Sequence, residues 1–144
     1  MAPGIRILKV WFDDDMLELQ IDVSDGVSSF ANRVYVGHGP FADTVARLDG
    51  FSDRLYGGLF DLRFGEFGPE YASGAFHARL HFPEPGRLHI TSRQESEYRN
   101  FAKKTVASRA TLYLRSEPVL LDRFLVELKG VSAGTRDGAW LEAV

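Results

Sequence analysis

The sequence contains no cysteine, which excludes disulfide bonds, thiol catalysis and thiolate metal ligands. No apolar run approaches the roughly 20 residues that a membrane-spanning helix needs, so a membrane partner is not expected. The first residues lack a basic stretch followed by an apolar core and predict no secretory signal. The expected location is therefore the cytoplasm, and any chemistry must come from side chains other than cysteine.

The length and composition predict one folded domain covering residues 1–144. A chain of 144 residues can bury a substantial core without a metal or a disulfide. Apolar residues make up 44% of it and charged residues 26%, which is typical of soluble globular proteins and not of disordered chains.

Charge is unevenly distributed along a chain whose net charge is only −3. Residues 1–75 carry a net charge of −6 and residues 76–144 carry +3, so we expect the two halves to attract each other within the fold. The segment Arg87–Arg115 holds seven cationic side chains and only two acidic ones. Tyr98, Phe101 and Tyr113 lie among these cations, as aromatic residues do on surfaces that bind single-stranded nucleic acid. The overall acidity argues against a nucleic-acid partner.

Apolar and polar residues alternate with the period of β-strands over most of the chain. Short turns such as Asp13–Asp15 and Ser24–Gly26 separate the alternating segments. The segment 94–104 is polar and predicts a loop. The expected strands cover residues 5–11, 17–23, 28–36, 60–64, 76–82, 88–91, 106–114 and 139–144.

Two segments instead follow the helical period. One begins at Pro40, presents Phe41, Val45 and Leu48 on one face, and is expected to end with a left-handed Gly50. Asp43, Thr44 and Arg47 are expected on its outward face. The second begins at Pro118 and is expected to end at Gly130 in the same way. Its inward residues are Leu121, Phe124, Leu125 and Leu128, and its outward residues are Asp122, Arg123 and Glu127.

The predicted order of elements is βββα–ββββα–β. Because the strands are joined by short turns, the sheet should be mainly antiparallel. The two amphipathic helices need an apolar surface to cover, and both are expected on one face of that sheet. The predicted fold class is therefore α+β.

Histidine supplies the first candidate site. His77, His81 and His89 have the polar parity of their strands, and His81 is expected opposite His89 across a turn. Three imidazoles on one sheet face could bind zinc or copper, with Asp61 on a neighbouring strand. A solvated or partner-facing surface would carry polar residues at the same positions. On that alternative the binding residues are His77, Arg79, His81, His89 and Thr91, and no cofactor is expected.

Other motifs carry little chemistry. Asp13–Asp15 lacks the spacing of a calcium loop and fits a charged turn. The glycines of residues 37–40 and 65–69 are not followed by Lys-Ser/Thr, so neither segment is a phosphate loop. The first does precede a helix N-terminus, where an anion can bind. Ser73 has no evident base, and no nucleophile motif is present, which favours a non-catalytic protein.

Several phrases together carry a resemblance: LQIDVSDG at 19–26, LDGF at 48–51, GEFGP at 65–69 and LDRFLVEL at 121–128. With these the chain resembles small uncharacterised bacterial proteins, similar in layout to WapI-type immunity proteins of polymorphic-toxin systems. The resemblance implies a shared fold and a toxin domain as partner, and it assigns no functional residue. The basic segment Arg87–Arg115 departs from what an inhibitor of a cationic nuclease would carry.

Three functions follow as hypotheses. The first is a non-catalytic protein-binding module, such as an immunity protein that neutralises a bacterial toxin. The second is a small metal-dependent or ligand-binding enzyme that uses the face of His77, His81 and His89. The third is a homo-oligomeric structural module that seals an exposed sheet edge.

Overall fold

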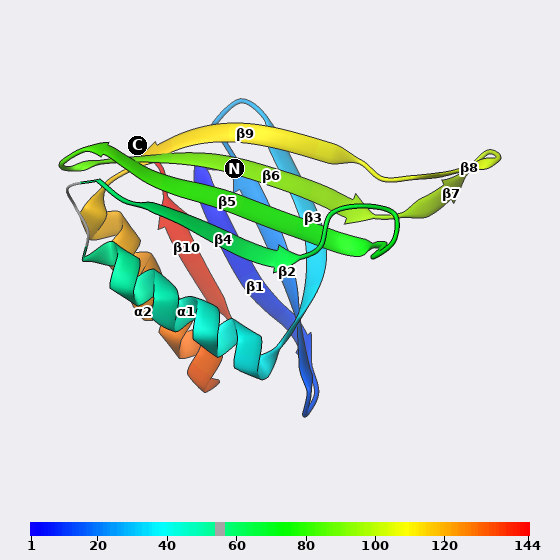
Figure 1. Ribbon diagram of the computed structural model, residues 1–144, viewed down its shortest axis with the longest axis horizontal. Coiled ribbons are helices and arrows are strands. Elements are labelled where there is room, and N and C mark those ends of the chain that lie inside the picture. Colours follow the sequence, from blue (N-terminus) through cyan, green and yellow to red (C-terminus); the bar gives the residue numbers. More distant parts are fainter. Residues whose placement is uncertain (54–56) are drawn as a thin grey trace.

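The computed structural model describes residues 1–53 and 57–144, which form ten strands and two helices (Figure 1). The fold class is α+β, and every paired strand of the described residues is antiparallel, as the sequence predicted. No helix among these residues is both long and apolar enough to cross a membrane.

Eight of the ten strands are divided between two four-stranded sheets, where the sequence predicted one sheet; the other two strands form a separate hairpin. The first sheet has the order β10-β1-β2-β3. Its strands are β1 (Gly4–Phe12), β2 (Met16–Ser24), β3 (Ser29–Gly37) and β10 (Gly138–Glu142). The second sheet has the order β4-β5-β6-β9. Its strands are β4 (Leu59–Gly65), β5 (Ser73–Glu84), β6 (Arg87–Glu97) and β9 (Arg109–Ser116).

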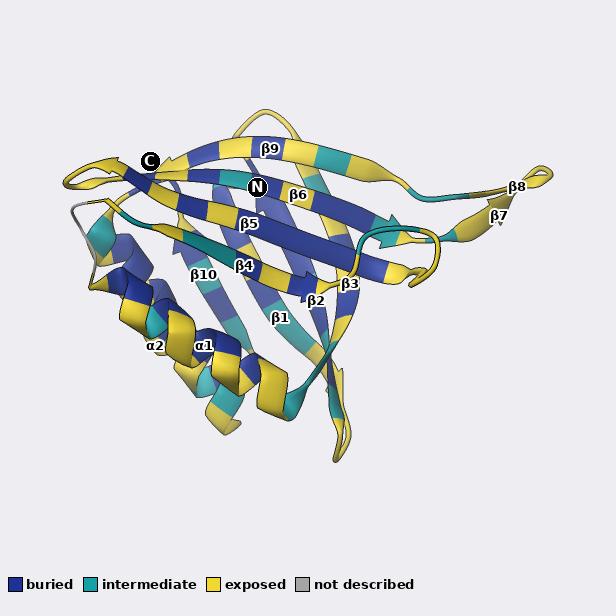
Figure 2. Ribbon diagram, in the orientation of Figure 1, coloured by how far each residue is buried: buried dark blue, intermediate teal, exposed yellow. Residues whose placement is uncertain are grey.

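The two helices lie side by side and close the open side between the sheets, α1 (His38–Ser52) following β3 and α2 (Pro118–Ala133) following β9 (Figure 1). Figure 2 shows that each helix turns a buried stripe inward and an exposed stripe outward. Apolar residues of both sheets and both helices form one continuous core. Phe41, Phe76, Phe82 and Phe124 are among its largest fully buried side chains.

The predicted helix faces are confirmed except at Thr44, and both predicted helix ends are wrong. Thr44 is buried because its hydroxyl donates to the Pro40 carbonyl one turn earlier. Helix α1 continues through Gly50 to Ser52, and α2 continues beyond Gly130 to Ala133. The left-handed residue is Gly134, with φ 79°. A Cβ on Gly130 would lie 2.7 Å from the Arg136 side chain, so a larger residue there would displace that side chain.

The predicted loop at 94–104 is wrong, because β6 continues to Glu97 and a hairpin follows it. This hairpin consists of β7 (Arg99–Phe101) and β8 (Lys104–Val106) and projects away from the body (Figure 1). Gln94 and Glu95 are polar, yet they are almost fully buried because hydrogen bonds satisfy their side chains. Polarity therefore does not mark a loop here.

The two sheets approach each other most closely where β3 runs beside β5 and β6. Gly74 allows this contact, since a Cβ on it would lie 2.2 Å from the Arg33 carbonyl oxygen. The predicted turns at the ends of the first sheet are confirmed. Asp13 Oδ1 accepts the N–H groups of Asp15 and Met16, both at 2.8 Å, and Asp25 caps the next turn in the same manner.

Candidate functional site

One face of the second sheet points away from the core and carries mostly charged residues. Its strands alternate, so Leu62, Leu80, Ile90 and Leu114 point inward while their neighbours point outward. We define the polar residues on this side as the outer face. Between the register pairs Glu95–Arg109 and His89–Arg115 they are Asp61, Arg63, His77, Arg79, His81, His89, Thr91, Arg93, Glu95, Arg109, Thr111, Tyr113 and Arg115. Ser73, Arg87 and Glu97 continue the same parity beyond these pairs. The five binding candidates taken from the sequence, His77, Arg79, His81, His89 and Thr91, all lie on it.

Asp61 of β4 is the acceptor for two candidates on β5. His77 Nε2 donates to Oδ1 at 2.8 Å, and Arg79 Nε donates to the same oxygen at 2.9 Å. The ionised carboxylate can only accept, so Nε2 of His77 carries the proton. The hydrogen bond from Arg79 is the main reason that the pKa of Asp61 falls to about 2. Asp61 is therefore a fixed negative charge that orients both side chains.

His81 and His89 face each other across β5 and β6, as predicted, and both are exposed. His77 lies four residues along β5 from His81, two positions away on the same face, and is buried against Asp61. Among residues 1–53 and 57–144, no three His, Asp or Glu side chains come close enough together to hold a metal ion. The histidine metal site thus gains no support from the arrangement of its ligands.

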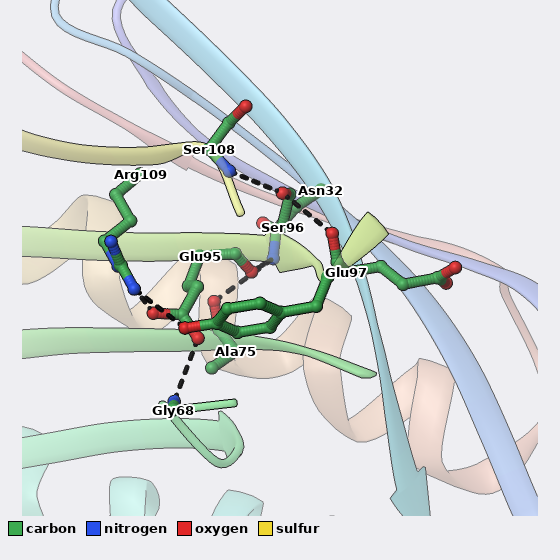
Figure 3. A network of polar contacts seen from close by, with 9 residues as sticks. Asn32, Gly68, Ala75, Glu95, Ser96, Glu97, Ser108 and Arg109 are labelled. Atoms are coloured by element: carbon green, nitrogen blue, oxygen red, sulfur yellow. Dashed lines mark hydrogen bonds and ion pairs between the residues drawn. The ribbon is translucent and has the colours of Figure 1, made fainter. Parts of the chain in front are cut away.

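Glu95 is the centre of a second cluster, at the end of the outer face where the hairpin leaves the sheet (Figure 3). Its side chain is only 4% exposed; one oxygen accepts the Gly68 N–H at 2.9 Å and the other accepts Arg109 Nε at 2.7 Å. Burial acts to raise the pKa of Glu95, and these hydrogen bonds outweigh it, so the pKa lies below its usual value. Arg109 also donates to the Tyr98 hydroxyl at 2.7 Å. The cluster joins three separate segments.

The binding residues predicted from the sequence do not include the arginines of this face outside β5, although several of them belong to the basic segment Arg87–Arg115. Arg63, Arg93 and Arg115 share the outward parity, and the register places Arg63 and Arg93 on either side of His77. The Arg93 guanidinium lies 5.2 Å from the ring centre of Phe67, which holds it over the sheet. Within the described part of the chain, none of these three arginines has a carboxylate at ion-pair distance. The alternation along their strands was the sequence signal that could have placed these arginines on the outer face.

The hollows on the outer face are shallow. One of about 290 Å³ lies between Arg93 and Arg109, with Glu95 and Thr111 in its lining. Another of about 340 Å³ lies between His89, Tyr113 and Arg115. Small-molecule sites usually enclose most of their ligand. These hollows suit single side chains of a partner better than an enclosed substrate.

The remaining sequence candidates have structural roles. His38 Nε2 bonds the Asp13 carbonyl at 2.7 Å and joins the start of α1 to the β1–β2 turn. Gly68 belongs to the segment 65–69 and donates to Glu95. The Ser73 hydroxyl donates to the Tyr71 carbonyl at 2.6 Å.

Charge complementarity between the two halves of the chain is present in part. Asp61 with Arg79 and Asp49 with Lys129 pair an acid of the first half with a cation of the second. Lys9 with Asp137 pairs the halves in the opposite sense.

Comparison with protein-family models, with curated proteins and with solved structures finds no match for this chain.

Proposed function

We propose that this protein is a non-catalytic protein-binding module whose outer face docks onto an acidic surface of its partner. The observation that carries the proposal is the charge of an uncovered sheet face. Five arginines lie on it against two carboxylates, Asp61 and Glu95. Both carboxylates are already paired with arginines of the face. Just beyond the face, Arg87 and Glu97 have the same parity and add one charge of each sign. The excess positive charge is therefore available to a partner.

The residue types of the outer face also match those of protein interfaces. Arginine and tyrosine are enriched at binding hot spots, and Tyr113 is 71% exposed on the edge strand β9. Arg79 and Arg109 are oriented by their carboxylates, and Arg93 is oriented by Phe67. Side chains that are ordered before binding lose less conformational entropy when the complex forms.

Within this proposal the partner is a toxin domain and the chain is its immunity protein, as the resemblance implies. The chemistry of the face adds that the toxin surface it covers is acidic. An acidic surface is not the active site of a cationic nuclease. The toxin would therefore be a protein other than a cationic nuclease, or the chain would bind a nuclease surface away from its nucleic-acid site.

A single-stranded nucleic acid would match the charge but not the aromatic pattern. Sheet platforms of that kind stack bases on aromatic side chains of their central strands. Here the central strands β5 and β6 present His, Arg and Thr outward, and the aromatic residue Tyr113 belongs to the edge strand. An oligothymidylate of 20 residues tests this alternative directly by fluorescence anisotropy.

The homo-oligomeric alternative would use the free edge of the second sheet. Strand β9 presents Arg109 and Arg115, so two copies paired along this edge would bring like charges together. Light scattering of the purified protein tests this alternative.

The test of the proposed function uses the tagged chain to isolate a stoichiometric partner from its native host, followed by titration with the purified partner. We expect the double variant Arg63→Ser/Arg93→Ser to bind at least about tenfold more weakly, because two hot-spot cations are lost. Arg47→Ser/Arg123→Ser is the matched control, since both are exposed arginines of the helices, away from the outer face. Equal affinities of the double variant and the control would refute the proposed face.

A further inference from the structure

The hairpin β7–β8 with its flanking residues, which we define as the arm (residues 98–107), projects beyond the body of the protein. Residues 99–105 of the arm are all exposed, while Tyr98, Val106 and Ala107 at its base are half-buried (Figure 2). Phe101 is 68% exposed near the tip. A single exposed apolar residue is ordinary on a protein surface. The arm combines this exposed phenylalanine with three further features that point to a bound protein.

The first feature is charge. Residues 98–108 contain three cationic side chains, Arg99, Lys103 and Lys104, and no acidic one. The cations surround Phe101 in the sequence, so the tip presents an aromatic ring among positive charges. Such a tip is complementary to an apolar hollow with acidic residues on its rim.

The second feature is that the base of the arm is fixed while the tip is free. Ser96 N–H donates to the Ser108 carbonyl at 2.8 Å, and Tyr98 N–H donates to the Ala72 carbonyl at 3.0 Å. Arg109, held by Glu95, donates to the Tyr98 hydroxyl. An isolated two-stranded hairpin is only marginally stable, so these bonds set the direction of the arm. A direction set in advance lowers the cost of binding.

The third feature is continuity with the outer face. The arm leaves the sheet from the end of β6 and returns into β9, the strand that carries Tyr113. A partner seated on the outer face therefore lies next to the base of the arm. We infer that the arm is the second contact of the binding surface and inserts Phe101 into an acidic-rimmed cleft of the partner protein. This inference rests on the proposed function.

Photocrosslinking tests separately whether a partner binds the outer face and whether the arm contacts that partner. Phe101, Tyr113 or Val27 is replaced in turn by the photoreactive residue p-benzoylphenylalanine, and each protein is irradiated in a lysate of the native host. Val27 is the control, since it is 96% exposed in the turn between β2 and β3, outside both the arm and the outer face. We expect one protein adduct of the same mass from positions 101 and 113, and none from 27. Each adduct is treated with protease and with nuclease.

The outcomes are distinct. An adduct from 113 without one from 101 overturns the arm contact and leaves the proposed function in place. Absence of an adduct at both positions overturns both claims. An adduct that nuclease removes identifies a nucleic acid as the occupant and also overturns both.

Titration with the crosslinked partner, purified separately, tests the chemistry of the insertion. We expect Phe101→Ala to weaken binding about tenfold or more, as loss of an aromatic anchor does. We expect Lys103→Glu/Lys104→Glu to weaken binding as well, and the loss of affinity should be larger at low salt than at high salt. Arg47→Glu/Arg123→Glu is the matched double charge reversal outside the arm. A normal affinity of Phe101→Ala overturns the inserted ring, and equal effects of the two charge reversals overturn the acidic rim.

Discussion

The side-chain amide of Gln94 donates a hydrogen bond of 2.8 Å to Oδ1 of Asn32, and the two residues belong to different sheets. The Asn32 amide in turn donates to the carbonyls of Ala75 and Glu95, at 3.1 and 2.9 Å. Gln94 Nε2 also lies 3.1 Å from the Ile21 carbonyl oxygen. Two buried amides thus join backbone groups of both sheets where β3 passes β5 and β6.

We expect Asn32→Ala to lower the free energy of unfolding by about 2–3 kcal/mol, because it removes the Gln94–Asn32 bond and takes the Asn32 donor from two buried carbonyls, those of Ala75 and Glu95. Urea denaturation measures the change. Asn100→Ala, at an exposed position on the arm, should change stability by less than about 0.5 kcal/mol. Similar small effects of both variants would show that the two sheets do not depend on this contact.

Gly74→Ala tests the close approach of β3 to β5. Gly74 has φ +95°, and its Cβ would lie 2.2 Å from the Arg33 carbonyl oxygen. We expect a loss of at least about 2 kcal/mol from strain and displaced backbone. Gly50→Ala is the matched control, because Gly50 is helical with open space around it, and it should gain up to about 1 kcal/mol. A Gly74→Ala protein as stable as the wild type would contradict the packing of the sheets.

Ser92→Ala should stabilise the protein. The Ser92 side chain is 1% exposed on the inward side of β6, and its hydroxyl has no hydrogen-bond partner among the described residues. Removing an unsatisfied buried hydroxyl should raise the free energy of unfolding by about 1 kcal/mol. Thermal denaturation by circular dichroism measures the gain. A marked loss of stability would mean that the hydroxyl has a partner, such as a buried water.

Asp61→Asn should make stability less dependent on acid. The pKa of Asp61 is lowered in the fold from 3.8 to about 2, so the folded state prefers the ionised carboxylate. Its contribution is full above the unfolded pKa and is lost as the pH falls toward 2. We expect the variant to be about 1–2 kcal/mol less stable at pH 7, since the side chain is 28% exposed and solvent weakens the pairing.

The measurement for Asp61 is urea unfolding of both proteins between pH 7 and pH 2.5. The gap between wild type and variant should be constant from pH 7 to about pH 5 and should then narrow. A gap that stays constant down to the lowest pH would show that the ionised carboxylate is not what the variant removes. Asp43→Asn, at an exposed position of α1 and outside the ion pairs of the described residues, serves as the control for removing one surface charge.

The strands were predictable because alternation is a local pattern that burial of one sheet face imposes. The same parity placed His77, Arg79, His81, His89 and Thr91 on one face, as the structure has them. The loop predicted at 94–104 was wrong at Gln94 and Glu95, because each is polar yet buried through contacts with residues distant in the chain. The helix ends predicted at Gly50 and Gly130 were wrong, because glycine permits a left-handed conformation without requiring one.

The sequence alone therefore determined the α+β class, the antiparallel pairing of neighbouring strands and the parity of the outer face. These features depend on contacts between residues close in the chain or on simple periodicity. Tertiary structure decided the division into two sheets, the Asn32–Gln94 contact, the grouping of arginines from four strands and the direction of the arm. These depend on pairs of residues distant in the chain, whose meeting is set by packing of the whole core and not by any local pattern.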